Sequence, residues 1–408
     1  MIQHFFPTYK RLLATTTYST KRYLFSTFSL QNRLTGLVGP RGTGKTTLLL
    51  QYIKLTIQDI DKCMYTSMDN LFFSNNTLLS FVNELYEIHG IRYLFLDEIH
   101  KYPNWNQELK NIYDSYPDLF VVFSGSSSID LIQGSYDLSR RAVIYRLDGL
   151  SFREYLSFLG IFQSEHLDFQ DLINNKSNHE LALSQIEKLR GHFQDYMQRG
   201  YYPFFLEDPD TYKQKLFRVI EKTIFEDVSN FYKLKTENLV YFKRILTYLT
   251  TIPPGQLNRN NIAKNLGLDN KTVQSYLEIL QNTGLVNLIC SNKSGSNTLK
   301  TTEKIYLDNP NLYYAISQAT GYSAEAGTIR EVFFIRMLKS AGKSVFYSPV
   351  GDFQVDQTYF EIGGKNDPRK NKSRSQIKHH LNSSFLVKDD ILYSSPGEIP
   401  LYLFGFLY

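Results

Sequence analysis

The chain contains little cysteine and no long apolar run, and both absences limit what it can be. Its two cysteines, Cys63 and Cys290, lie far apart in the sequence and have no metal-ligand neighbours. We expect both thiols to be buried and reduced, which suits a cytoplasmic protein. No segment approaches the roughly 18 consecutive apolar residues that a membrane-spanning helix requires. The N-terminus lacks a charged stretch followed by an apolar core, so we expect no secretory signal and no membrane partner.

Acidic residues are missing from positions 1–58, although the net charge of the whole chain is only +5. This acid-poor, Ser/Thr-rich start resembles an organelle transit peptide in composition. Because a glycine-rich motif follows so closely, we interpret residues 1–33 as a basic flank that packs on the domain behind it. The flank faces either nucleic acid or water. The basic residues of positions 1–58 are Lys10, Arg11, Lys21, Arg22, Arg33, Arg41, Lys45 and Lys54.

The glycine-rich motif is Gly39-Pro40-Arg41-Gly42-Thr43-Gly44-Lys45-Thr46-Thr47, which fits G-x-x-x-x-G-K-[ST] without a mismatch. Apolar residues 34–38 predict a buried strand before it, and residues 47–54 predict a helix after it. Its glycines let the backbone turn N–H groups toward an anion, and the helix adds the positive end of its dipole. We expect Lys45 to reach the β- and γ-phosphates of ATP and Thr46 to complete a Mg²⁺ shell. The alternative is a chance glycine-rich loop.

Two acidic residues, Asp97 and Glu98, follow the apolar run 93–96. Such a run predicts a parallel strand buried on both faces, with the acids at its carboxyl end, where ligands collect. We expect Asp97 to hold Mg²⁺ and Glu98 to polarise the attacking water, since phosphoryl transfer depends on positioning and charge neutralisation. The alternative is a solvated acidic turn. Asp97-Glu-Ile-His100 also matches the D-E-x-H box of some helicases, but we find no second recombinase-like unit, which those enzymes need.

Strands and helices alternate through the first 150 residues, which predicts an α/β fold with a doubly wound parallel sheet. One strand ends at Ser124, whose hydroxyl could sense the γ-phosphate or simply form a turn. Arg140 and Arg141 precede the fifth strand. Either one of them reaches the nucleotide of a neighbouring subunit as an arginine finger, or both are simply exposed on the surface. The expected strands are 34–38, 62–67, 93–97, 119–124 and 142–147, and the expected helices are 47–54, 77–88 and 104–113.

Beyond residue 150 the pattern becomes mainly helical. Residues 150–235 predict a helical lid. Helical segments and a two-stranded wing over about 237–308 predict a winged helix. The last unit, 312–408, begins with a helix at 328–340 and ends in the aromatic tail 401–408, for which we predict a buried terminal strand.

Three motifs give the chain a resemblance to a known family: Leu96-Asp-Glu-Ile-His-Lys-Tyr-Pro-Asn-Trp105, Ser124-Gly-Ser-Ser-Ser128, and Arg141 with Leu150-Ser-Phe-Arg-Glu154. With them the chain resembles prokaryotic AAA+-type P-loop ATPases that carry a winged helix and an uncharacterised C-terminal domain with a restriction-endonuclease-like core. The resemblance implies an ATPase core (1–150), a helical lid (151–236), a winged helix (237–310) and an endonuclease-like α/β domain (311–408). It gives Lys45, Thr46, Asp97 and Glu98 the roles described above. Arg141 takes the place of the family's Gly-Arg arginine, although residue 140 is arginine in this chain.

The C-terminal part of the resemblance rests on Tyr347-Ser-Pro-Val-Gly-Asp-Phe-Gln-Val-Asp356 and Phe360-Glu-Ile-Gly-Gly-Lys365. Nucleases of that fold set an Asp and a Glu around Mg²⁺ with a Lys two residues after the Glu. Asp356 and Glu361 are therefore candidates for a second Mg²⁺ site. Gly363 stands where the lysine is expected, and Lys365 lies about 7 Å further along a strand, so we interpret the site as degenerate. Glu331 is either a further acid ligand or a solvated helix residue.

The winged helix could place Lys271, Thr272, Gln274 and Ser275 in a DNA major groove with Lys293 at the backbone, or it could serve only for protein docking. The basic run 369–380 could hold phosphates or be solvated. The sequence thus predicts a Mg²⁺-dependent AAA+-type ATPase that acts with DNA or a protein partner and could form a homo-oligomer. The alternatives are a nucleotide-switched DNA- or protein-binding module with little turnover and an ATP-gated nuclease.

Overall fold

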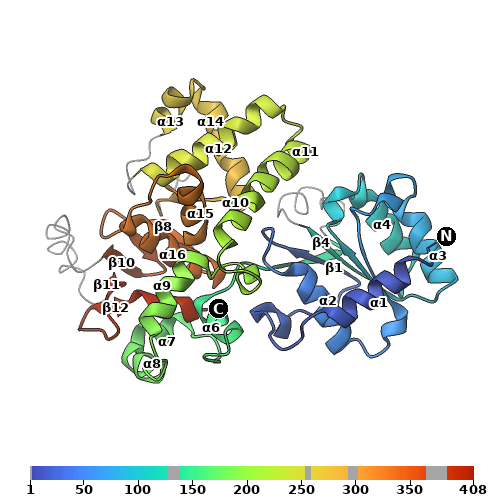
Figure 1. Cartoon of the computed structure of the whole chain (residues 1–408), viewed down its shortest axis with the longest axis horizontal. Coiled ribbons are helices and arrows are strands. Elements are labelled where there is room, and N and C mark those ends of the chain that lie inside the picture. Colours follow the sequence, from blue (N-terminus) through green and yellow to red (C-terminus); the bar gives the residue numbers. More distant parts are fainter. Residues whose placement is uncertain (1, 126–137, 139, 253–258, 293–301, 364–383) are drawn as a thin grey trace. The chain divides into compact units, whose positions relative to one another are not determined.

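The computed structural model describes residues 2–125, 138, 140–252, 259–292, 302–363 and 384–408. The chain divides into two compact units, unit 1 (Met1–Gly149) and unit 2 (Leu150–Tyr408). Figure 1 labels the helices and strands of both. The predicted ATPase core coincides with unit 1 to within one residue, whereas the predicted lid, winged helix and C-terminal domain all fall within unit 2.

Unit 1 is built on a sheet of five parallel strands in the order β2-β3-β4-β1-β5. The residue register pairs Val38 of β1 with Gly125 of β4 and with Arg146 of β5, so the carboxyl ends of these strands lie at one edge of the sheet. The predicted P-loop α/β core and its five strands are thereby confirmed. The strands are β1 (Leu34–Val38), β2 (Cys63–Ser67), β3 (Tyr93–Asp97), β4 (Phe120–Gly125) and β5 (Ala142–Arg146).

Helices cover both faces of this sheet. The chain crosses from β1 to β2 in one direction and returns through β3 to β4 in the other, so right-handed crossovers place α2 on one face and α3 and α4 on the opposite face. Figure 1 shows α2 and α4 on either side of β1 and β4. The helices of unit 1 are α1 (Phe5–Thr15), α2 (Lys45–Thr56), α3 (Leu78–Glu87) and α4 (Trp105–Ser115). Helix α1, from the basic flank, buries Phe5, Tyr9 and Leu13 in the core of unit 1.

Unit 2 combines helices with two small sheets. Its mixed sheet has the order β12-β11-β10-β9-β8, with parallel pairing from β10 to β12 and antiparallel pairing from β8 to β10. A separate antiparallel pair joins β6 to β7. The strands are β6 (Val286–Cys290), β7 (Thr302–Leu307), β8 (Val345–Tyr347), β9 (Phe353–Val355), β10 (Thr358–Gly363), β11 (Ser384–Lys388) and β12 (Glu398–Pro400).

The helices of unit 2 surround this sheet and extend beyond it. Helix α16 is its central helix, because it is buried along most of its length and packs on β10 and on the C-terminal 3₁₀ helix. Elements α12, α13, α14, β6 and β7 follow one another in the order that the sequence predicts for residues 237–308. The helices are α6 (Phe152–Phe158), α7 (Phe169–Asn174), α8 (Lys176–Leu183), α9 (Leu189–Arg199), α10 (Tyr212–Lys222), α11 (Ser229–Tyr232), α12 (Thr236–Thr251), α13 (Arg259–Leu266), α14 (Asn270–Asn282), α15 (Pro310–Thr320) and α16 (Ala326–Ser340).

Two local predictions are wrong. The aromatic tail is not a strand, because Leu401–Phe406 forms a buried 3₁₀ helix after β12. A segment with apolar residues on all sides can be either a buried strand or a buried helix, so the pattern alone did not decide between them. In the 3₁₀ helix, Gly405 packs so closely on Phe152 that an added Cβ would lie 2.5 Å from the Phe152 Cβ. The second error concerns the thiols. Cys63 is buried, and burial raises the pKa of its thiol to about 12, but Cys290 is exposed at the last position of β6.

Candidate functional site

The glycine-rich loop lies where the motif predicts, between the end of β1 and the start of α2. Gly39 must be glycine because a Cβ there would lie 2.1 Å from the backbone oxygen of Leu147. Gly44 adopts φ 90°, in the left-handed region that favours glycine, and α2 begins at the next residue. The N–H groups of the first turn of α2 have no acceptors within the helix, and the positive end of its dipole is directed at the loop, which is the arrangement that binds phosphate.

Lys45 is buried within this loop. Its Nζ donates to the backbone oxygens of Gly39 at 2.8 Å and Pro40 at 3.0 Å. Thr43 reinforces the same turn, since its Oγ1 donates to the Pro40 oxygen at 2.9 Å. Lys45 thus holds a buried positive charge beside the backbone that the glycines shape.

Asp97, at the end of β3, is the centre of a buried hydrogen-bond network. Its Oδ2 accepts from Thr46 Oγ1 at 2.5 Å and from the Tyr65 hydroxyl at 2.7 Å. Its Oδ1 accepts from the Ser124 hydroxyl and from the Glu98 backbone N–H at 3.1 Å. Hydroxyl and carboxylate oxygens are ligands that Mg²⁺ prefers, and water and phosphate oxygens complete its coordination shell. Thr46 and Asp97, the pair that the sequence predicts for the metal, therefore fit the ion.

Glu98 lies beside this network but points to other partners. Its backbone has φ 52°, in the left-handed region that non-glycine residues seldom adopt. Its Oε2 lies 3.5 Å from Arg41 NH1 and 3.4 Å from His100 Nε2, so the carboxylate lies between the glycine-rich loop and the short 3₁₀ helix that follows Glu98. A carboxylate fixed in this way can orient a water molecule next to a bound phosphate.

Tyr65 on β2 is a site residue that the sequence analysis missed. Burial, and then the charge of Asp97, raises the pKa of its hydroxyl, so the hydroxyl stays protonated and donates to the carboxylate. No motif marks it. Only the pairing of β2 with β3 could have pointed to it. That pairing aligns Ser67 with Asp97 and so places Tyr65 two residues before the carboxyl end of β2.

Arg141 does not belong to this cluster. It precedes β5, at the edge of the sheet opposite the glycine-rich loop, because Ala142 pairs with Leu34 at the start of β1. Its guanidinium forms a two-point ion pair with Asp114 of α4, with Nε to Oδ1 and NH2 to Oδ2 both at 3.1 Å. Arg140 is exposed. The structure thus brings together Lys45, Thr46, Asp97, Glu98 and Ser124, while Arg140 and Arg141 lie at the other edge.

The two candidate acids of the C-terminal sheet, Asp356 and Glu361, lie in different parts of the β9–β10 hairpin. Asp356 lies in the β9–β10 turn and pairs with Lys343 at 3.0 Å. Glu361 is buried on β10, at least three residues, or about 10 Å, beyond the turn. Among the described residues, no group of three or more His, Cys, Asp or Glu side chains is placed to hold a metal ion. Lys365, Lys293 and the basic run 369–380 lie outside the described residues.

A buried lysine, Lys304, lies between two acidic side chains of unit 2. Lys304 of β7 lies 3.3 Å from Glu331 Oε2 and 3.7 Å from Asp352 Oδ1, and the Tyr306 hydroxyl donates to the same Glu331 oxygen. Glu331 is buried, so its interpretation as a solvated helix residue is wrong. These residues do not fit a Mg²⁺ site, because the lysine already supplies the compensating charge.

Replacing Lys304 by methionine should destabilise unit 2 in a pH-dependent way. Burial raises the pKa of Glu331 above 4.5, although Lys304 lowers it. Because the pKa of Glu331 is higher in the folded than in the unfolded chain, its contribution to stability is fully present below the unfolded pKa. That contribution is lost as the pH rises through the folded pKa. Without Lys304 that loss grows, to about 3–5 kcal/mol for a broken buried pair. Thermal unfolding at pH 5 and pH 8 measures it.

The matched control is Lys343→Met, which breaks the more exposed pair with Asp356 and should cost at most about 1 kcal/mol. Adding Glu331→Gln to Lys304→Met should restore much of the stability at pH 8. Equal unfolding temperatures for wild type and Lys304→Met at both pH values would show that the buried pair carries no stability.

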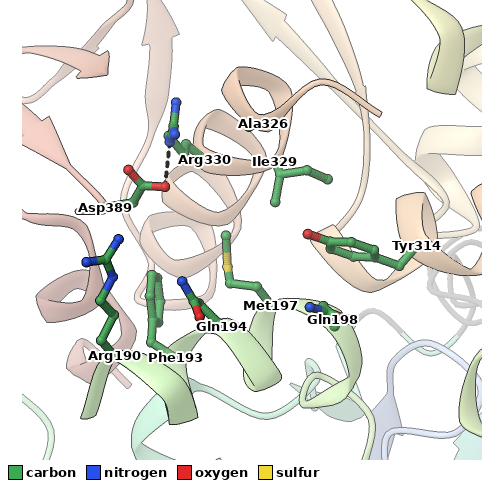
Figure 2. Close-up of a pocket in the computed structure, with 10 residues that line it drawn as sticks. All are labelled: Arg190, Phe193, Gln194, Met197, Gln198, Tyr314, Ala326, Ile329, Arg330 and Asp389. Atoms are coloured by element: carbon green, nitrogen blue, oxygen red, sulfur yellow. Dashed lines mark ion pairs between the residues drawn. The ribbon is translucent and has the colours of Figure 1, made fainter. Parts of the chain in front are cut away.

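Unit 2 also contains a cavity of about 250 Å³ between α9 and the N-terminal half of α16 (Figure 2). Phe193, Met197 and Ile329 form its apolar part. Asp389 is the one carboxylate among its lining residues, and it pairs with Arg330 at 2.6 Å. The cavity lacks the combination of phosphate-binding loop and acidic pair that unit 1 provides, so unit 1 holds the stronger candidate site.

Two family models match separate parts of the chain. The family model described as AAA domain matches residues 31–156, and a domain of unknown function, DUF8612, matches residues 190–323. The first match covers the glycine-rich loop, Asp97, Glu98 and Ser124. Within the described part of the chain, no helix is both long and apolar enough to cross a membrane.

Two proteins of Methanocaldococcus jannaschii are similar to most of the chain. The uncharacterized protein MJ1637 is 28% identical over 88% of this chain and 82% of its own length. The uncharacterized protein MJ1544 is 22% identical over 87% of this chain and 76% of its own length.

Solved structures give only distant matches. AMPPCP-bound DnaA from Aquifex aeolicus matches with 16% identity, a TM-score of 0.26, and coverage of 69% of this chain and 88% of that chain. C. elegans PCH-2 matches with 20% identity, a TM-score of 0.24, and coverage of 38% and 45% respectively. At such TM-scores the likeness says nothing about the activity of this chain.

Proposed function

We propose that this chain is a Mg²⁺-dependent, ATP-binding and ATP-hydrolysing protein of AAA+ type. The observation that carries the proposal is the contact of Thr46 with Asp97 at 2.5 Å, directly beside the glycine-rich loop and Lys45. The AAA domain match over residues 31–156 supports it. Steady-state phosphate release from the purified chain with ATP and Mg²⁺ tests it, and release no faster than in a protein-free control would count against turnover.

Each residue of the site has one task in this proposal. Lys45 and the N–H groups of the loop bind the β- and γ-phosphates. Thr46 and Asp97 hold Mg²⁺, which when bound neutralises charge between the phosphates. Glu98 orients the attacking water and accepts its proton. Ser124, near the end of β4 and hydrogen-bonded to Asp97, contacts the γ-phosphate in this proposal.

We further propose that the chain works as a homo-oligomer in which Arg141 acts on a neighbour's nucleotide. Arg141 lies a full strand, about 16 Å, from the loop of its own subunit, so it can reach a γ-phosphate only in a second copy. Mixing Arg141→Ala, which keeps an intact loop, with Lys45→Ala, which keeps the arginine, should restore hydrolysis above that of either variant alone. If Arg141→Ala hydrolyses ATP as fast as wild type, the ion pair with Asp114 is the whole role of Arg141. Mixing Arg140→Ala with Lys45→Ala tests the neighbouring arginine in the same way.

A DNA or protein partner is proposed for the winged-helix region of unit 2. Lys271, Gln274 and Ser275 are exposed on α14, whereas Thr272 is engaged with its capping residue Asp269 through a 2.5 Å hydrogen bond. Arg259 of α13 donates to Gln274, which adds a second basic side chain to this face. DNA affinity that falls steeply with salt would support phosphate contact, and no binding at low salt would leave protein docking as the role.

Two alternatives have separate tests. A nucleotide-switched module with little turnover would bind ATP without releasing phosphate above background. An ATP-gated nuclease would nick supercoiled plasmid with Mg²⁺ or Mn²⁺, and the nicking would disappear in Asp356→Ala or Glu361→Ala. The lysine-filled acid cluster of unit 2 favours the ATPase without nuclease activity.

A further inference from the structure

An arginine from the basic flank connects the glycine-rich loop to the end of unit 1. Arg22 precedes the 3₁₀ helix Tyr23–Ser26 and is buried. Its NH1 donates to the backbone oxygen of Thr43, and its NH2 donates to the backbone oxygens of Asp148 and Gly149, both at 2.8 Å. Thr43 is the residue between the last two glycines of the loop, and Gly149 is the last residue of unit 1.

Neighbouring contacts hold the same two segments together. The Tyr23 hydroxyl donates to the Arg146 oxygen at 3.1 Å and accepts from the Asp148 N–H at 3.3 Å. The Leu147 N–H donates to the Val38 oxygen at 2.8 Å. The backbone of residues 146–149 therefore runs directly against the end of β1 and the loop that follows it.

Burying the Arg22 guanidinium costs free energy, so its hydrogen bonds to the two segments must compensate for that cost. A buried charge is tolerated only when it is well hydrogen-bonded. Here one rigid, planar guanidinium donates hydrogen bonds to backbone oxygens in two separate segments. If Thr43 moves when a phosphate enters the loop, its carbonyl must either pull Arg22 along or lose a charge-assisted hydrogen bond. Arg22 in turn holds residues 148 and 149, immediately before unit 2 begins at Leu150.

We propose that Arg22 is a positioning residue that holds the phosphate-binding loop in shape and couples its occupancy by nucleotide to the segment that leads into unit 2. The coupling rests on the ATP binding proposed above. Arg22 reaches the loop through the backbone oxygen of Thr43, so its effect on ATP passes through that residue. The flank that carries it thereby becomes part of the nucleotide site.

The test compares Arg22→Gln with Arg33→Gln in the full chain. Arg33 is a matched control, since its NH1 also bridges two backbone oxygens, those of Tyr113 and Tyr116 at 3.1 Å, but at the end of α4. Losing hydrogen bonds from a charged group at the loop should raise KM for ATP about tenfold in Arg22→Gln, with kcat changed less than about threefold. Arg33→Gln should leave KM unchanged while lowering thermal stability.

The second readout is amide hydrogen exchange of the peptide that covers residues 146–152. In wild type, ATP with Mg²⁺ should slow this exchange. In Arg22→Gln, saturating ATP should no longer slow it, whereas in Arg33→Gln the effect should persist. Arg22→Lys keeps the charge but lacks the planar two-point geometry, so it should recover most of the ATP affinity and only part of the exchange effect.

The outcomes separate the coupling from the proposed ATPase. A wild type that binds no ATP would overturn both. A wild type that binds ATP, together with an Arg22→Gln variant that shows the same KM and the same slowing of exchange, would overturn the coupling alone. If Arg22→Gln does not fold, Arg22→Lys provides the decisive comparison, and an exchange effect equal to that of wild type would then contradict the proposal.

Discussion

Replacing Lys45 by alanine should abolish ATP binding by the full-length chain. Lys45 is the buried cation of the loop, and its ammonium group would exchange the oxygens of Gly39 and Pro40 for those of the β- and γ-phosphates. A charge-assisted contact of this kind contributes about 1.5–3 kcal/mol, and Lys45 would make one to each of two phosphates, so we expect affinity to fall by a factor of about 100 or more. Equilibrium dialysis with ATP and Mg²⁺ measures the change.

The control for this experiment is Lys54→Ala, an exposed lysine in the last turn of the same helix. It removes the same charge from α2 but lies two to three turns from the loop, so its ATP affinity should match that of wild type. Equal affinity for Lys45→Ala and wild type would contradict the assignment of the loop as the phosphate site. A parallel loss in both variants would instead point to a general effect of charge.

Glu98→Gln should bind ATP nearly as well as wild type but hydrolyse it very slowly. The substitution keeps the shape of the side chain and removes the group that accepts a proton from water. General-base catalysis contributes about 10²- to 10⁴-fold, so kcat should fall by at least about 100-fold while KM changes little. Phosphate release under saturating ATP, together with ATP affinity, separates the two effects.

Two contacts make this variant informative. Arg41 and His100 both lie within 3.5 Å of Glu98 Oε2, so a loss of folding or of loop structure would appear as a loss of ATP affinity as well. Glu87→Gln, at an exposed position of α3, is the control for removal of one negative charge. Unchanged turnover in Glu98→Gln would remove Glu98 from the mechanism.

The parts of the site that lie within short motifs could be predicted from the sequence. The loop, Lys45 and Thr46 follow from one pattern of consecutive residues, and Asp97 follows from an apolar run that ends in acids. The parallel sheet then explains why Thr46 and Asp97 meet, since β3 and β1 end at the same edge on either side of β4. Ser124 at the end of β4 completes this group for the same reason.

The residues that the sequence did not reveal act through tertiary contacts. Tyr65 lies in an ordinary strand, and Arg22 lies 21 residues before the carbonyl of Thr43 that it binds, so no local pattern marks either one. In unit 2, the family resemblance suggested Asp356 and Glu361 as a pair of metal ligands, but Asp356 lies in the β9–β10 turn and Glu361 is buried further along β10. The buried pair of Lys304 with Glu331 joins residues from β7 and α16, which only the folded chain brings together.

The most direct test of the account is retention of radiolabelled ATP by the purified full-length chain, with and without Mg²⁺. We predict saturable binding of one ATP per chain that is stronger with Mg²⁺, because Thr46 and Asp97 would hold the ion against the phosphates. Addition of unlabelled ATP should release the label. No saturable retention at millimolar ATP with Mg²⁺ would contradict the central claim that unit 1 grips a nucleotide and its metal.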